Sequence, residues 1–314
     1  MRLLLSLRRL LRPPQFASDG RQAELHSSVR PYRTRVSRAG VEGLSSMSDD
    51  AAKAWAKWHE GRVETVTAPY GPLTLTGTHW LADYPEGRIP AVPGRWRETA
   101  GGVRLTATEA DGLALDAEPF TGETDLAPDS GPPARARLAA GARHLVVIRR
   151  EGAHAVRVFD PDAEARRTFL GIEATPYDPS YVLPGRFRAY GEERSVLVEN
   201  ADGHRRGLDL GGELVLERDG AEHRLQVAVD ADTGALWAVF ADVTSSLTSY
   251  RFRFLRPGAP AADGSITVDL NRVLLPPCAF AGHFICPFPP PGNTLPFEVA
   301  AGERRLKAAL APVI

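Results

Sequence analysis

The sequence predicts an all-β protein, an antiparallel β-sandwich or barrel-like body with a short N-terminal helix and a long proline-rich C-terminal loop. Two observations carry this prediction. Short apolar runs with period-two spacing recur from residue 73 onward, as in half-buried strands. Gly, Pro and Asp separate these runs, and no amphipathic helical pattern lies between them, which favours antiparallel sheets over a parallel α/β fold.

Length and charge limit the possible functions. The 314 residues suffice for one large β domain or two smaller ones. With 38 Lys and Arg against 39 Asp and Glu, the formal net charge is -1, so the chain lacks the basic excess of a nucleic-acid-binding protein. The sequence has no apolar stretch of the roughly 18 residues that a membrane-spanning helix requires. We therefore expect neither a nucleic-acid nor a membrane partner.

Residues 1–46 differ from the rest in composition. They contain nine arginines, no lysine and three acidic residues, a pattern that fits an organellar transit peptide or a basic arm for RNA or anionic lipid. Arg8 and Arg9 interrupt the apolar start, which argues against a secretory signal. We interpret 1–46 as a disordered leader, with Met47 as an alternative start, and predict a cytoplasmic protein whose globular body spans 47–314.

The first regular element expected is a short helix over residues 51–59. Ser48, Asp49 and Asp50 supply a cap and early acidic residues before a run of good helix formers. We expect this helix to end near Gly61. Trp55 and Trp58 are three residues apart, so they share one face of the helix, and we predict that this face docks onto the β body.

The strands follow in order. Period-two spacing predicts strands around residues 73–75, 103–105 and 113–115, and a hairpin from 144–149 to 153–159. A second meander runs from 214–216 through Asp219-Gly220 to 225–229, then turns at 230–234 into 235–240. The proline-rich span 127–133 fits a linker or a surface loop, so a division into two β subdomains near 127–143 stays open.

Several motifs together resemble one family. They are Arg157-Val-Phe-Asp160, Phe169-Leu-Gly-Ile172, Pro176-Tyr-Asp-Pro179, Phe240-Ala-Asp-Val-Thr244, Asp269-Leu-Asn271, Pro-Pro-Cys278 and the run from Cys286 to Asn293. In this order they resemble the bacterial family known as domain of unknown function 1684, over roughly residues 57–303. The family pattern has Phe at position 270 and Asn at position 275, where this chain has Leu. The resemblance supports the domain boundaries and implies no activity.

The proline-rich loop holds both cysteines. Cys278, His283 and Cys286 form a Cys-x4-His-x2-Cys pattern, which supplies three of the four ligands of a zinc site. The second half of a zinc signature is missing, so we predict no cofactor and keep zinc as an alternative. A disulfide and a reactive Cys278 thiol beside a histidine are further alternatives. We expect the cysteines to be packing residues in a stiff loop.

Polar residues gather at the ends of the predicted strands. If these ends meet beneath the proline-rich loop, they form a polar pocket for an anionic or polyhydroxyl small molecule. The alternative is that the same residues cap turns and pair with one another. The candidate ligand-binding residues are Arg157, Asp160, Asp242, Thr244, Tyr250, Asp269, Asn271 and Asn293.

Three classes of function therefore remain. The first is a small-molecule pocket, in which hydrolase-like chemistry is conceivable but no catalytic residue is assigned. The second is a noncatalytic β module that binds a protein or a glycan. The third is a zinc-binding protein centred on the Cys/His loop. Whether the protein is an enzyme stays open on the sequence.

Overall fold

The computed structural model describes residues 38–129 and 131–308. The described residues from Leu44 onward form one compact unit. The predicted leader, 1–46, lies mainly outside the described residues, although the backbone of its last residues, 38–46, is already helical. Among the described residues, no helix is both long and apolar enough to cross a membrane.

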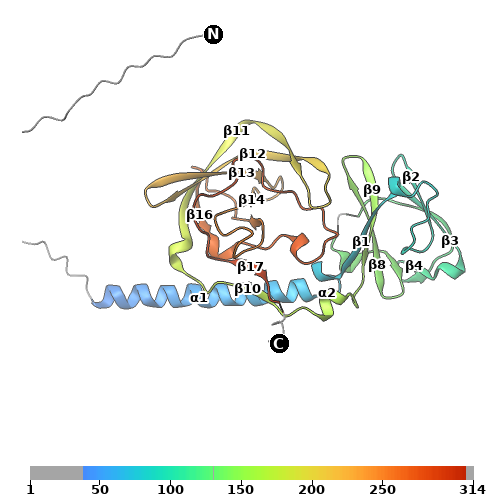
Figure 1. Ribbon diagram of the computed structural model, residues 1–314, viewed down its shortest axis with the longest axis horizontal. Helices are drawn as coiled ribbons and strands as arrows, with labels where there is room; N and C mark the ends of the chain where they lie inside the picture. The colour runs from blue at the N-terminus through green and yellow to red at the C-terminus, as the bar shows by residue number, and fades with distance from the viewer. Residues whose placement is uncertain (1–37, 130, 309–314) are drawn as a thin grey trace, which may run out of the picture. The chain divides into compact units, whose positions relative to one another are not determined.

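Antiparallel sheets confirm the predicted fold class, since all pairs of described strands are antiparallel (Figure 1). The strands before residue 160 pair only with one another, and so do those after residue 171. The first group contains β1 Leu75–Trp80, β2 Arg95–Thr99, β3 Gly102–Ala107, β4 Leu113–Leu115, β5 Glu118–Pro119, β6 Gly122–Leu126, β7 Leu138–Ala140, β8 Arg143–Arg150 and β9 Ala153–Phe159. The second contains β10 Ile172–Ala174, β11 Val182–Glu199, β12 Arg205–Arg218, β13 Ala221–Val229, β14 Leu236–Phe240, β15 Arg253–Leu255, β16 Ser265–Asp269 and β17 Glu303–Leu306.

The first group makes two sheets around a shared core. One sheet has the order β1-β9-β8-β7-β4-β5 and the other the order β2-β3-β6. Trp96 and Leu105 from the smaller sheet pack with Leu145, Val147 and other buried residues of the larger one. Segment 127–143 connects β6 to β7 and β8 inside this group, and the strand partners change between residues 159 and 172. A subdomain division near 127–143 stays a prediction.

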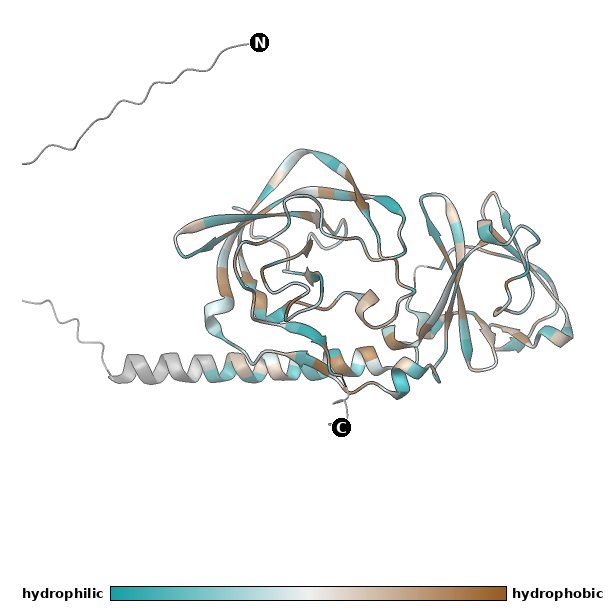
Figure 2. Cartoon of the chain, viewed as in Figure 1, coloured by the Kyte–Doolittle hydropathy of each residue, from teal (hydrophilic) through white to brown (hydrophobic). Residues whose placement is uncertain are grey.

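The second group has a six-stranded sheet in the order β15-β14-β13-β12-β11-β16. Hydrophobic and polar residues alternate along its long hairpins (Figure 2), and the buried face includes Leu214, Leu216, Leu225 and Val227. The predicted Asp219-Gly220 turn is confirmed, with positive φ angles of 52° and 75°, which match the twist of a two-residue hairpin turn.

The predicted N-terminal helix is confirmed and is longer than expected, because α1 runs from Arg38 to Thr67 through Gly61. A glycine inside a helix costs about 1 kcal/mol relative to alanine, and tertiary contacts beyond Gly61 offset that cost. Val66 is fully buried. Arg62 donates to a carboxylate oxygen of Glu303 in β17 at 3.0 Å.

The proline-rich segment between β16 and β17 has no long regular element, as predicted, and contains two 3-10 turns, Leu270–Arg272 and Pro277–Ala279. Ala281, Phe284 and Ile285 pack on the face of β8 and β9 that points away from the first core. The hydroxyl of Thr78 in β1 donates to the carbonyl of His283 at 2.8 Å. The loop therefore connects the two groups of strands.

Candidate functional site

Five of the eight predicted site residues are short polar side chains that form hydrogen bonds among residues after 171. Four of them bond to backbone groups, and Thr244 bonds to the side chain of Asp242. Asp242 has a fully buried side chain that accepts hydrogen bonds from the hydroxyl of Thr244 at 2.9 Å and from the amide of Val299 at 2.6 Å. The Oδ1 of Asn271 accepts the amide of Asp178 at 2.9 Å, and its Nδ2 donates to Asp269. Short polar side chains commonly stabilise turns and irregular segments in this way. The residues in question are Asp242, Thr244, Asp269, Asn271 and Asn293.

The other three occupy different places. Asp160 accepts the amide of Asp162 at 2.8 Å in the turn after β9. Tyr250 donates its hydroxyl to the carbonyl of Cys278 at 3.3 Å. Arg157 alone among the eight lines the cavities described below. In the structure Asp242 therefore contacts Thr244, and Asp269 contacts Asn271. Arg157 lies apart from both pairs, beside the cavities.

Cys278, His283 and Cys286, the zinc ligands of the alternative hypothesis, do not come together as a metal site in the described part of the chain. Within 38–129 and 131–308, no group of three or more His, Cys, Asp or Glu side chains is arranged to hold a metal ion. Both cysteines are free, Cys286 buried and Cys278 half-buried. The amide of Cys278 donates to the sulfur of Cys286 at 3.3 Å, and the backbone carbonyl of His283, not its ring, is bonded to Thr78.

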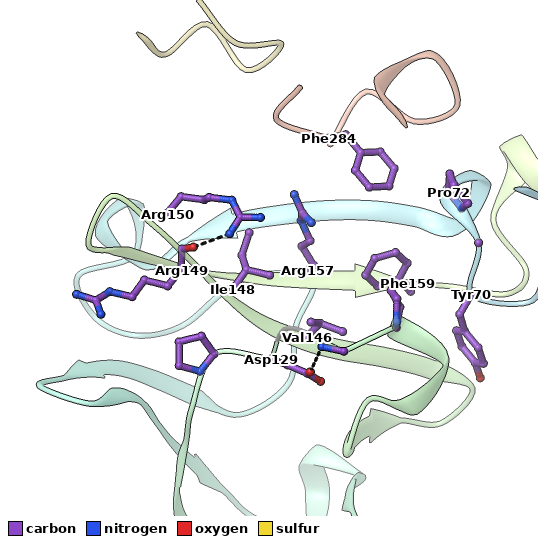
Figure 3. A pocket seen from close by; sticks show the side chains of 14 residues that line it. Tyr70, Pro72, Asp129, Val146, Ile148, Arg149, Arg150, Arg157, Phe159 and Phe284 are labelled. Atoms are coloured by element: carbon purple, nitrogen blue, oxygen red, sulfur yellow. Dashed lines mark hydrogen bonds between the residues drawn. The ribbon is translucent and has the colours of Figure 1, made fainter. Parts of the chain in front are cut away.

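A cavity of about 470 Å³ lies on the outer face of β8 and β9. We call it the apolar cavity. Its walls include Val146 and Ile148 from β8, Phe159 from β9 and Phe284 from the proline-rich loop (Figure 3). Arg149, Arg150 and Arg157 lie toward one end and Tyr70 toward the other (Figure 3). Asp129 is the acidic residue among the lining groups.

Strand register explains why these side chains share one face. In the β8–β9 hairpin, Val146 is opposite Arg157 and Ile148 is opposite Ala155. Since side chains alternate between the two faces of a sheet, Val146, Ile148 and Arg150 point to the same side as Arg157 and Phe159. The opposite face of the hairpin, with Leu145 and Val147, belongs to the first core.

Arg157 is a half-buried cation whose pKa is shifted by no acidic residue among the described ones. Its Nε atom is buried and has no hydrogen-bond partner among the described residues. The guanidinium lies 5.4 Å from the ring centre of Phe284. Burial, together with the nearby Arg150, lowers the pKa of Arg157 to about 10. The group is still charged at neutral pH, so an anion beside it would be stabilised.

A second cavity, of about 460 Å³, meets the first at Arg150, Arg157 and Phe284. We call it the arginine cavity because its lining also includes Arg206 and Arg256 and contains no acidic residue. Arg206 forms a two-point ion pair with Asp202, both contacts at 2.8 Å. The indole Nε1 of Trp237 is buried here without a partner among the described residues. Cys286 lines the same cavity.

Sequence reasoning missed most of these residues. Arg150 is the first residue of the predicted hairpin turn and resembles a solvated turn residue, while Arg206 and Trp237 come from strands of the second group. In the structure Arg150 pairs with Ala153 at the end of the β8–β9 ladder, one residue beyond the strand end predicted from the sequence. This pairing places its side chain on the side of Arg157.

Comparison with known proteins decides the family. A family model described as Protein of unknown function (DUF1684) matches residues 167–304. The chain belongs to this family. The DUF1684 segment comprises Trp237, Phe284 and both cysteines, whereas Arg150 and Arg157 precede it. No curated protein matches the chain.

One solved structure similar to this DUF1684 protein is the solution NMR structure of an uncharacterized protein from Haloarcula marismortui. The two sequences are 30% identical over 44% of this chain and 78% of that chain, with a TM-score of 0.37.

Proposed function

We propose that the protein binds a small organic acid, with the apolar body of the ligand in the apolar cavity and its acid group against Arg157. One observation carries this proposal. The guanidinium of Arg157 is half-buried beside apolar walls, its Nε is buried without a partner among the described residues, and the charged group that most affects its pKa is another arginine. A partly desolvated cation without a counter-ion is costly, and a bound carboxylate would relieve that cost.

Size and lining support the same ligand class. Small-molecule sites have volumes of roughly 300–1,000 Å³ and apolar walls with a few polar groups, and the apolar cavity is about 470 Å³. Val146, Ile148 and Phe159 are each at most 5% exposed. These walls favour an apolar ligand body over a polyhydroxyl one, because sugar hydroxyl groups would find few partners there.

The proposal concerns binding, and hydrolysis stays without an assigned residue. The protein would act in the cytoplasm of a bacterial cell on a small molecule, without nucleic acid, in keeping with its balanced charge.

Calorimetric titration with decanoate, 1-decanol and inorganic phosphate tests the proposal. Decanoate has both an apolar chain and a carboxylate, so we expect it to bind more tightly than either of the other two probes. Arg157→Gln should weaken decanoate binding about 10- to 100-fold, the range for loss of charge-assisted hydrogen bonds. It should leave the weaker binding of 1-decanol unchanged.

The matched control is Arg97→Gln. Arg97 is exposed on β2 and lines neither cavity, so decanoate should bind this variant as it binds the wild type. Equal binding of decanoate to the wild type and to Arg157→Gln would overturn the proposed site. Tighter binding of phosphate than of decanoate would contradict the proposal that the ligand has an apolar body.

A further inference from the structure

The two cysteine side chains are in contact. Cys278 belongs to the turn Pro277–Ala279 and Cys286 follows eight residues later. The backbone amide of Cys278 donates to the sulfur of Cys286 at 3.3 Å. The thiol of Cys286 also forms a hydrogen bond with the sulfur of Cys278. Both sulfur atoms are therefore held together by the loop, although both residues are free thiols.

Their surroundings make the two thiols unequal. The hydroxyl of Tyr250 lies 3.7 Å from the sulfur of Cys278. Hydrogen bonding from Cys286 is the main reason that the pKa of Cys278 falls to about 7, with smaller contributions from Tyr250 and Arg251. The pKa of Cys286 is raised, because its proton is held by the hydrogen bond to Cys278 and because it is buried. Cys278 is thus the more readily ionised sulfur.

The pair lies beside the arginine cavity. Cys278 is half-buried, and Cys286 and Pro277 line the arginine cavity. Arg157 lines the same cavity and contributes positive charge near Cys286. An accessible sulfur with hydrogen-bond donors and a second thiol in contact is the arrangement of redox-active cysteines.

We propose that Cys278 and Cys286 form a redox-active dithiol that hydrogen peroxide converts to a disulfide. The Cys278 thiolate attacks one peroxide oxygen, the O–O bond breaks, and the departing hydroxide takes up a proton from solvent to give water. Cys278 is then a sulfenic acid. The Cys286 sulfur attacks the Cys278 sulfur, the S–O bond breaks, and the released hydroxide takes the Cys286 proton as the second water. Two thiols lose two electrons and one peroxide gains them.

Hydrogen peroxide titration with intact-mass and peptide mass spectrometry tests this reaction. The wild type should lose two hydrogens and yield a peptide that links Cys278 to Cys286. The Cys286→Ser variant should retain one oxygen on Cys278 that dimedone captures. The Cys278→Ser variant should remain reduced at the same peroxide concentration. Serine is close to cysteine in size, and thermal unfolding of each variant establishes that it is folded.

A second measurement separates reactivity from packing. The rate at which iodoacetamide modifies Cys278 should rise with pH to a midpoint near 7, the pKa of Cys278, and the Tyr250→Phe variant should shift that midpoint upward. A thiol at its ordinary pKa of 9.0 would react about 50-fold more slowly at pH 7. The proposal fails if Cys278→Ser is oxidised as fast as Cys286→Ser, or if folded wild type forms no disulfide at peroxide concentrations that oxidise the unfolded chain.

Discussion

Asn293 shows how single buried side chains connect distant segments of this protein. It is fully buried. Its Oδ1 accepts the amide of Gln226 at 2.8 Å, and its Nδ2 donates to the carbonyls of Gln226 and Val239, each at 2.9 Å. The Asn293 side chain thus forms hydrogen bonds with the backbone of β13 and β14 that the backbone of a neighbouring strand would otherwise form. Asn271 forms similar bonds with both backbone groups of Asp178.

We predict that Asn293→Ala destabilises the protein by about 3 kcal/mol, because it leaves buried donors and acceptors without partners. Urea denaturation measures the change. Thr294→Ala is the control, since the side chain of Thr294 is exposed, and it should change the stability by at most about 0.5 kcal/mol. Equal effects of the two substitutions would contradict this account of Asn293.

These residues also show how much of the candidate site can be predicted from the sequence. Local patterns located Asp269 and Asn271 at a strand end and Asn293 in the proline-rich loop. What each side chain faces depends on segments far away in the sequence, such as Gln226 for Asn293. The local sequence is the same for a residue that lines a pocket and for one whose side chain binds backbone groups. Only Arg157 of the predicted set lines a cavity, and it was placed there by the hairpin register.

At the scale of elements, α1 is joined to the C-terminal strands by polar contacts as well as apolar ones. Trp55 donates its indole proton to the carbonyl of Asn271 at 2.7 Å, which confirms the predicted docking of that face. Arg62 pairs with Glu303 of β17, a residue with a fully buried side chain. The capping pattern at Ser48 predicted the helix but neither of its ends, because contacts distant in sequence stabilise the turns beyond Gly61.

The Glu303→Gln variant should destabilise the protein more at pH 4 than at pH 7. Burial is the largest effect on the Glu303 carboxyl, and it raises the pKa above the ordinary value of 4.5. The folded state therefore binds the Glu303 proton more tightly than the unfolded chain. The resulting stability is complete below the unfolded pKa and is lost as the pH rises through the folded pKa.

Glutamine cannot titrate, so the difference in unfolding free energy between wild type and variant should shrink as the pH increases. Urea denaturation at pH 4, 5.5 and 7 measures it. A difference that grows with pH would mean that the ion pair with Arg62 outweighs burial.

At the scale of the whole molecule, the proline-rich loop connects the two groups of strands. Phe284 packs on the outer face of β8 and β9, while Phe288, four residues later, packs on Phe252 with ring centres 5.2 Å apart. The β8–β9 hairpin and the β12–β13–β14 meander followed from local alternation and turn residues in the sequence. The contact between the groups did not, because it depends on where an irregular loop lies, and irregular loops have no period that could be recognised.

We predict that Phe284→Ala increases hydrogen exchange in β8 and β9 more than in β12 and β13. Removal of the ring leaves a gap between the loop and the first group, at a cost of about 3 kcal/mol or less because the side chain is only half-buried. Hydrogen exchange with mass spectrometry resolves the strands. The control is Phe288→Ala, for which we expect the larger increase in the second group. The same pattern in both variants would show that Phe284 does not connect the groups.

The buried guanidinium of Arg253 has a consequence for the synthesis of this protein. Its Nη atoms donate to the carbonyls of Val299, Ala301 and Glu303, and Asp242 lies 3.3 Å away. Until residues 299–303 have left the ribosome, the sheet that contains Arg253 must leave this cation in water or bury it with most of its acceptors missing. The second sheet can therefore close around Arg253 only after residues 299–303 have emerged, however early its strands are synthesised.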